Sequence, residues 1–177
     1  MLSLSKVLKN LSGGTPQFFA HKKFNLRKMS NSNYKLTEVD GDLFNAPSTH
    51  SLAHCVAADL GMNAGIAVKF KQLYGQVDQL KSQGVKTGGV AVLNDNKRFI
   101  YYLVTKDKNL DKPTYESLKN SLYAMRDHMI TNHVQNLAMP HIGCGIDGLE
   151  WAKVSAELER VFANVNVHIV VYNFVPK

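Results

Sequence analysis

The stretch "MPHIGCGIDGLE" spans residues 139–150, and its glycines Gly143, Gly145 and Gly148 fit the pattern G-x-G-x-x-G. This pattern is typical of the turn that holds a dinucleotide pyrophosphate between a strand and a helix. In a Rossmann domain the turn follows the first strand, and several more strands come after it. Only residues 149–177 follow here, which is room for one helix and one strand. The position therefore argues against a Rossmann oxidoreductase and is compatible with a phosphate-binding turn of another fold.

The chain around this stretch alternates between strand-like and helical patterns. Apolar runs and alternating residues predict strands at the start of 34–44 and in 51–58, 135–140 and 166–174. An Asn-Asp-Asn turn within 88–106 joins two further strands as a hairpin. Helical patterns cover 64–74, 76–83, 113–134 and 149–165. This order predicts an α/β domain with a mixed sheet and helices on both faces.

The composition is that of an ordinary globular protein, with 45% hydrophobic and 20% charged residues in a chain of 177. Its length suits one domain with a short additional segment. The sequence has no run of about 18 apolar residues, so we expect no membrane span. Cys55 and Cys144 are too few for a disulfide framework, and the histidines lack metal-ligand spacing. We therefore expect neither a metal nor a cofactor.

The formal charge of +7 is concentrated near the N-terminus. Residues 1–33 contain six basic residues and no acidic one, whereas the rest of the chain has 15 Lys and Arg against 14 Asp and Glu. We expect residues 1–33 to be a basic flexible tail or a mitochondrial transit peptide, which a product starting at Met29 would lack. Residues 34–177 should form the folded domain, and a nearly neutral domain is not expected to bind nucleic acid directly.

Two glycine-containing loops are candidates for binding phosphate. Residues 61–67 and 143–148 each follow a predicted strand and precede a predicted helix. Backbone amides at a helix N-terminus favour an anion, and two such loops suit a ligand with two phosphates. Asp42 follows another strand, and its carboxylate could accept a hydrogen bond from an adenine amino group. Asp147 has a second interpretation, because "DGLE" resembles a capping box in which this residue has no chemical role.

Lys106 ends the predicted strand "FIYYLVT", at the point where the chain becomes polar. One interpretation is an ordinary surface lysine after a strand. The other is a lysine partly desolvated in a cleft, whose amine can attack the anomeric carbon of a sugar. A carboxylate such as Asp147 could then transfer protons, but the sequence does not show that the two side chains meet.

Seven segments together resemble the macrodomain family, in its branch of terminal ADP-ribose protein glycohydrolase. They are "GDLF", "SLAHC", "GIAVKF", "GGVAVL", "YYLVTK", "KPTYESL" and "PHIGCGIDGLEW", in order within residues 34–175. The resemblance implies a three-layer α/β/α macrodomain with a mixed sheet of about six strands. It also implies a hydrolase that removes ADP-ribose from glutamate or aspartate side chains, with O-acetyl-ADP-ribose as a related substrate.

The resemblance also implies roles for individual positions. Lys106 matches the nucleophile that attacks the distal ribose after release of the protein carboxylate, and Asp147 matches the carboxylate that assists proton transfer. Asp42 matches the residue that recognises adenine, with Leu43 beside it. The remaining positions match segments that contact the riboses and the pyrophosphate: Met62, Asn63, Ala64, Gly65, Ile66 and Ala67, then His141, Gly143, Cys144, Gly145 and Ile146.

Three positions depart from the usual pattern of the branch. Asn63 stands in place of a glycine, and asparagine tolerates unusual backbone angles better than most residues. His141 stands where an arginine is common, and Gly148 where a larger residue is. We expect these changes to affect affinity and substrate preference, not the class of reaction.

A reader module that binds ADP-ribose without hydrolysing it is the alternative function. The presence of both Lys106 and Asp147 favours the enzyme. The expected partners are ADP-ribose and ADP-ribosylated proteins, with no membrane, and we expect a monomer. The resemblance implies a protein of the nucleus and cytoplasm that acts in the response to DNA damage. If residues 1–33 are a transit peptide, the expected location is the mitochondrion.

Overall fold

The computed structural model of the protein describes residues 33–175. The predicted basic tail or transit peptide therefore lies outside the described residues, except for Asn33. Within residues 33–175, no helix has both the length and the apolar character needed to cross a membrane.

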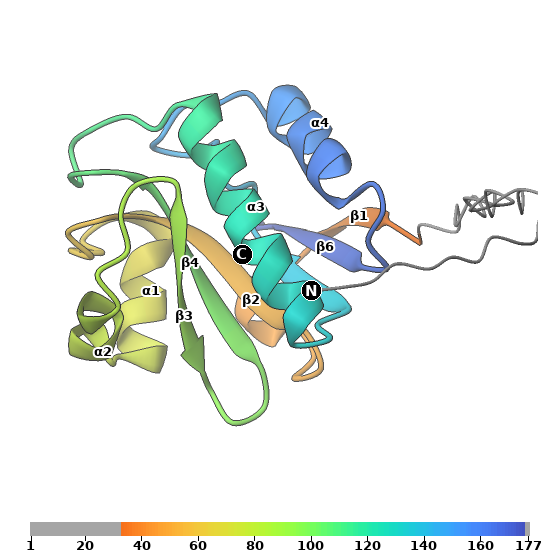
Figure 1. Ribbon diagram of the computed structural model, residues 1–177, viewed down its shortest axis with the longest axis horizontal. Coiled ribbons are helices and arrows are strands. Elements are labelled where there is room, and N and C mark those ends of the chain that lie inside the picture. The colour runs from red at the N-terminus through yellow and green to blue at the C-terminus, as the bar shows by residue number, and fades with distance from the viewer. Residues whose placement is uncertain (1–32, 176–177) are drawn as a thin grey trace, which may run out of the picture.

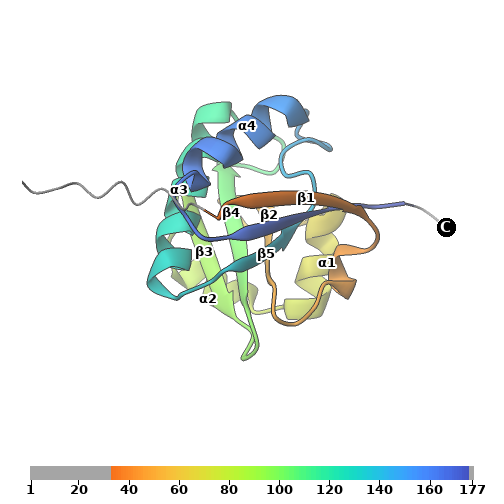
Figure 2. The same cartoon turned by 90° about the vertical axis from the view of Figure 1, so that its right-hand side faces the viewer.

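The centre of the domain is a six-stranded sheet in the order β1-β6-β5-β2-β4-β3. Neighbouring strands are parallel except for β3, which runs antiparallel to β4 as the predicted hairpin. Figure 2 shows the first and last strands, β1 and β6, side by side. All six predicted strands are confirmed: β1 (Lys35–Asp40), β2 (Ser51–Ala57), β3 (Gly89–Asn94), β4 (Phe99–Lys106), β5 (Asn136–Met139) and β6 (His168–Asn173).

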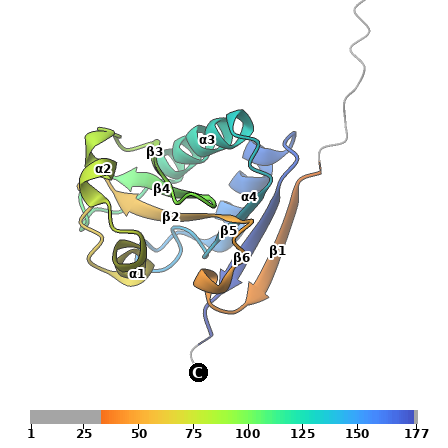
Figure 3. The same ribbon diagram turned by 90° about the horizontal axis from the view of Figure 1, so that it is seen from below.

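Helices cover both faces of this sheet and complete the predicted three layers (Figures 1 and 3). One face carries α1 (Gly65–Tyr74) and α2 (Val77–Ser82), and the other carries α3 (Tyr115–Thr131) and α4 (Trp151–Phe162). A short 3₁₀ helix, η1 (Leu43–Asn45), follows β1. The helix predicted over 113–134 is shorter at both ends. It begins after Thr114, which forms a capping box with Ser117, and ends before His133, whose φ is +55°.

Strand β4 shows how the sequence places one core on each face of the sheet. Tyr101 and Leu103 are fully buried against α3 and α4, while Ile100 and Tyr102 are buried on the side of α1 and α2. Successive side chains of a strand point to opposite faces, so an apolar run supplies both cores at once. Lys106 is the last residue of this strand, where the apolar run ends.

The start of α4 differs from the prediction. Glu150 is the N-cap residue, and its side chain pairs with Lys153 instead of capping the helix. Asp147 lies three residues before this cap, so the interpretation of "DGLE" as a capping box is wrong. Gly148, at a φ of +78°, turns the chain before the helix begins, and Asp147 faces β4 instead. The local pattern failed because a partner far away in the sequence holds the carboxylate.

Candidate active site

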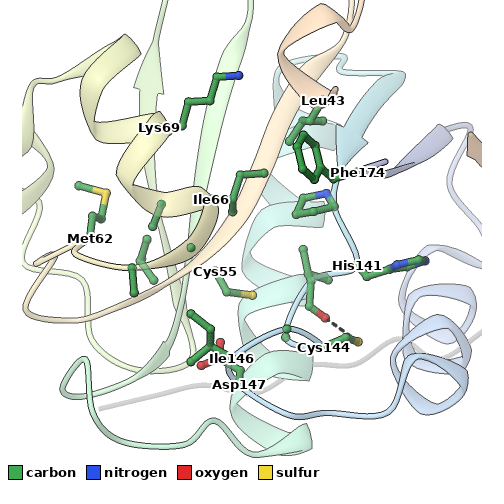
Figure 4. A pocket seen from close by; sticks show the side chains of 18 of the residues that line it. Leu43, Cys55, Met62, Ile66, Lys69, His141, Cys144, Ile146, Asp147 and Phe174 are labelled. Atoms are coloured by element: carbon green, nitrogen blue, oxygen red, sulfur yellow. Dashed lines mark hydrogen bonds between the residues drawn. The ribbon is translucent and has the colours of Figure 1, made fainter. Parts of the chain in front are cut away.

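A cleft of about 800 Å³ lies at the carboxyl ends of the parallel strands. The turn after β1, the end of β2, the start of α1, the end of β4, the loop after β5 and the end of β6 all contribute to its lining. In an open α/β sheet this edge is where ligands bind, because the loops that follow the strands gather there. Figure 4 shows Lys69 and Leu43 at one end of the cleft, and Ile146 with Asp147 at the opposite end.

The cleft brings together nearly all of the site residues predicted from the sequence. Of these residues, Asn63 is exposed and is the one outside the lining. The others line it: Asp42, Leu43, Met62, Ala64, Gly65, Ile66, Ala67, Lys106, His141, Gly143, Cys144, Gly145, Ile146 and Asp147. Segments up to 105 residues apart in the chain therefore meet in one site, as Asp42 and Asp147 show.

The first loop, between β2 and α1, takes a conformation that the sequence did not reveal. Leu60 and Met62 have φ values of +51° and +49°, while Asn63 is not among the residues with positive φ. The tolerance of asparagine for unusual angles is therefore not needed at position 63. The left-handed turn at Met62 is held by burial of its side chain, which is 4% exposed. Asp59 adds a link to the loop after β4, since its carboxylate accepts hydrogen bonds from the backbone N–H groups of Gly61 and Asn109.

This loop leads directly into α1, and the first residues of the helix line the cleft. The N-cap, Ala64, offers no side-chain hydrogen bond to the amides of the first turn. These N–H groups are left for another acceptor, and the helix dipole favours an anionic one. The start of α1 therefore provides the helix N-terminus that the sequence suggested for both glycine loops.

The second loop, residues 143–148, reaches the cleft without opening a helix. Gly143 has a φ of +71°, and a Cβ atom at this position would lie 2.8 Å from a side-chain carbon of Leu149. The positive φ favours glycine here, and any larger residue would also displace the end of the Leu149 side chain. Among the described residues, the backbone N–H groups of Gly145, Ile146 and Asp147 have no acceptor. These three residues line the same cleft, so their N–H groups are a second set of candidate donors for a ligand there.

Lys106 and Asp147 meet at the floor of the cleft. The Lys106 Nζ donates a hydrogen bond to Asp147 Oδ1 at 2.6 Å, and the two side chains are only 9% and 16% exposed. The carbonyl of Lys106 accepts a hydrogen bond from Ala58, where β2 and β4 shift register. Ser117 Oγ, in the first turn of α3, donates to the carbonyl of Thr105 at 2.7 Å. Hydrogen bonds to the carbonyl groups of Thr105 and Lys106 thus hold the backbone at the lysine in place.

Asp42 lies at the other end of the cleft and is also paired. Its Oδ1 accepts the backbone N–H of Phe44 at 3.0 Å, which caps η1, and its Oδ2 accepts from Lys69 Nζ at 2.8 Å. These two contacts, the one from Lys69 first, hold the pKa of the Asp42 carboxyl below its ordinary value. Asp42 is therefore an ionised acceptor with both oxygens oriented.

Two cysteines also line the cleft, Cys55 on β2 and Cys144 in the second loop. Burial raises the pKa of the Cys55 thiol to about 12 and also raises that of Cys144. A thiol is nucleophilic as its thiolate, so both cysteines stay protonated and unreactive near neutral pH. Neither cysteine is therefore a candidate nucleophile near neutral pH.

His141 forms a cluster at the rim with residues from two other elements. Its Nε2 lies 3.2 Å from Glu38 Oε2, and the Trp151 indole donates to Glu38 Oε1 at 2.7 Å. The His141 and Trp151 rings are 4.4 Å apart. These bonds, first that from Trp151, lower the pKa of Glu38. His141 is thus held at the rim by a carboxylate.

Several lining residues carried no recognisable signal in the sequence. Leu110 and Phe174 are apolar, 92% and 73% exposed, and stand in loops that the sequence marks only by their polarity or their place after a strand. Lys69 lies within the predicted helix 64–74 and resembles any other surface lysine. Residues 33–175 contain no cluster of three or more His, Cys, Asp or Glu side chains arranged to hold a metal.

The chain resembles known proteins in both sequence and structure. Residues 49–158 match the family described as Macro domain. The chain is 51% identical to the human ADP-ribose glycohydrolase OARD1 over 138 residues, which are 78% of this chain and 91% of the relative. The macrodomain of Thermus aquaticus DarG has a TM-score of 0.71 at 23% identity, over 79% of this chain and 99% of that one.

Thermosipho africanus DarTG in complex with ADP-ribose has a TM-score of 0.68 at 21% identity, over 80% of this chain and 42% of that one. The mixed six-stranded sheet between two helical layers agrees with these similarities. The fold predicted from the sequence is confirmed, and the chain belongs to the Macro domain family.

Proposed function

We propose that the protein is an ADP-ribosyl hydrolase that removes ADP-ribose from glutamate and aspartate side chains of modified proteins. The observation that carries this proposal is the contact of 2.6 Å between Lys106 and Asp147 at the floor of the cleft. An amine and a carboxylate in contact supply a nucleophile and a proton acceptor for cleavage of a sugar ester. The name of the human relative, an ADP-ribose glycohydrolase, supports the same reaction.

The proposed ligand lies along the cleft with its adenine beside Asp42 and Leu43. The pyrophosphate then lies between two groups of backbone donors, at the start of α1 and in residues 145–147. Such amides bind phosphate oxygens without a change in protein conformation. The distal ribose reaches Lys106 at the opposite end.

The proposed reaction has two steps. The bond between the anomeric carbon and the protein carboxylate breaks, Asp147 Oδ1 takes a proton from Lys106, and the neutral amine then attacks the anomeric carbon. The carboxylate leaves with the bonding electrons, and ADP-ribose remains covalently attached to Nζ. Water then attacks the same carbon, which releases ADP-ribose and restores the amine, while Asp147 transfers the protons. O-acetyl-ADP-ribose fits the same steps where its acetate is attached to the anomeric carbon, because the acetate then leaves as a carboxylate.

Release of ADP-ribose from a glutamate-modified protein tests the proposal. We expect the wild type and Lys108→Ala to release ADP-ribose at similar rates. Lys108 lies two residues after Lys106, but it is exposed and outside the cleft lining. We expect Lys106→Ala to release none while still binding ADP-ribose. Normal release by Lys106→Ala would contradict the mechanism, and binding without release by the wild type would indicate the reader function.

The covalent intermediate provides a second test. Asp147→Asn keeps the shape of the side chain but cannot accept the proton, so we expect slow formation and slower resolution of the adduct. Reductive trapping followed by mass spectrometry of the digested protein should place ADP-ribose on the peptide that contains Lys106. An adduct on any other lysine would rule out Lys106 as the nucleophile.

We further propose that the protein acts in the nucleus and cytoplasm, as the resemblance implies. Imaging of the full chain and of a chain starting at Met29 would test this, since mitochondrial location that depends on residues 1–28 would indicate a transit peptide.

A further inference from the structure

A second lysine–aspartate pair, Lys69 with Asp42, lies at the end of the cleft away from Lys106. Lys69 Nζ is 2.8 Å from Asp42 Oδ2, and the two side chains are 47% and 34% exposed. The pair joins α1 to the turn after β1, two elements that form opposite sides of the cleft (Figure 4). An ion pair this exposed contributes little to stability, so its position calls for another explanation.

The geometry leaves each oxygen of Asp42 able to accept one more donor. Phe44 N–H occupies one lone pair of Oδ1, and Lys69 occupies one lone pair of Oδ2. An ionised carboxylate has about four acceptor positions, so each oxygen keeps one toward a ligand. With both oxygens engaged, the carboxylate cannot rotate away from the cleft.

Lys69 is itself held in place. Its ammonium lies 4.5 Å from the centroid of the Phe44 ring, within the range of a cation–π contact. Phe44 packs edge-on against Phe70 of α1 at 4.9 Å, and Phe70 is fully buried. The ammonium is therefore positioned by the core as well as by the carboxylate it binds.

We propose that Lys69 is a positioning residue for base recognition, which orients the Asp42 carboxylate so that the cleft selects a nucleotide with an exocyclic amino group. The inference rests on the proposed function, in which adenine lies beside Asp42. The 6-amino group of adenine donates to the carboxylate, whereas the 6-oxo group of hypoxanthine has no hydrogen to donate there. A site that hydrogen-bonds a ligand N–H discriminates against the analogue without it, because the acceptor then loses its partner and faces another acceptor.

Binding of ADP-ribose and of its hypoxanthine analogue, measured by calorimetry, tests this role. We expect Lys69→Met to weaken binding of ADP-ribose about five-fold, as for the loss of one half-exposed charged contact, and to leave binding of the analogue nearly unchanged. Lys69→Arg should restore most of the affinity, since arginine also pairs with a carboxylate. In turnover, KM should rise and kcat should stay constant. Lys81→Met, an exposed lysine of α2 outside the cleft, is the matched control.

A double-mutant cycle separates action through Asp42 from direct contact with the ligand. In the Asp42→Asn background the carboxylate is gone, so we expect Lys69→Met to have little further effect. Equal losses for both ligands, or a full loss in the Asp42→Asn background, would overturn the inference, as would Lys69→Met behaving like Lys81→Met. If the wild type bound no ADP-ribose at all, the proposed function itself would fail, which is a distinguishable result.

Discussion

The cleft contains the same chemical pair twice, and the two pairs differ mainly in burial. Lys106–Asp147 and Lys69–Asp42 have contact distances of 2.6 and 2.8 Å. The side chains of the first pair are 9% and 16% exposed, whereas those of the second are 47% and 34% exposed. Charges in the interior interact strongly and are costly to separate, whereas water screens them at the surface. The buried pair is therefore suited to moving a proton, and the exposed pair to orienting a ligand.

The largest expected difference between the pairs is in turnover. Lys106→Ala removes the proposed nucleophile, so we expect kcat/KM for a glutamate-linked substrate to fall by at least about 1000-fold. Lys69→Ala should reduce it by less than about 10-fold, through KM, because it affects the binding of the base alone. Steady-state kinetics of both variants provide the comparison. Similar losses in the two would mean that burial does not separate their roles.

The coupling energy between lysine and aspartate should also be larger in the buried pair than in the exposed pair. Double-mutant cycles with Lys106→Met and Asp147→Asn should give about 2 kcal/mol of coupling in the free energy of unfolding, because each single change leaves a buried charge unpaired. The cycle with Lys69→Met and Asp42→Asn should give less than about 1 kcal/mol. Urea denaturation measures both. Equal coupling energies would show that the local dielectric at the two ends of the cleft is the same.

A group buried without any charged partner extends this comparison. His54 is fully buried, stacks on Phe70 at 3.8 Å, and its ring nitrogens have no partner among the described residues. Burial lowers its pKa from 6.5 to about 3. Between these values the unfolded state binds more protons, so stability falls as the pH falls, by up to roughly 1.4 kcal/mol per pH unit.

His54→Leu should remove this contribution. We expect the free energy of unfolding of the variant to depend less on pH between 6.5 and 4.5 than that of the wild type, as measured by urea denaturation at several pH values. Other histidines with lowered pKa values, such as His50 and His168, remain in both proteins, so the difference reports on His54. Identical slopes would show that the His54 ring is not kept neutral by burial.

The smallest expected effect is the pH dependence of binding at the exposed pair. Lys69 and the Phe44 amide lower the pKa of Asp42, so the carboxylate is present above that pKa and lost as the pH falls through it. In Lys69→Met the pKa should move back toward its ordinary value. Binding of ADP-ribose should then begin to weaken at a higher pH than in the wild type, which titration calorimetry from pH 7 to 4 would detect. No change in the onset would indicate that Lys69 does not act on the Asp42 carboxylate.

The predictions from the sequence that failed were those in which a short pattern stood for a tertiary contact. "DGLE" has the spacing of a capping box, but Asp147 pairs with Lys106, which lies on a strand 41 residues earlier. An unusual backbone angle was expected at Asn63, yet the residues of that loop with positive φ are Leu60 and Met62. Lys69 has the spacing of an ordinary helix surface residue. Its role depends on a carboxylate 27 residues away, which no local pattern indicates.

The sequence by itself determined the strands and helices, the two glycine-containing loops and, by resemblance, Lys106 and Asp147 as the residues to test. Local periodicity and turn chemistry decide the strands, helices and loops, since these depend on neighbours a few residues apart, whereas the choice of the two residues rests on the resemblance. Only the tertiary structure decided which lysine meets which aspartate, and how deeply each pair is buried. The strand order brings the ends of β1, β6, β5, β2 and β4 to one edge. Charge interactions depend on distance and on the surrounding dielectric, and both are properties of the packed fold.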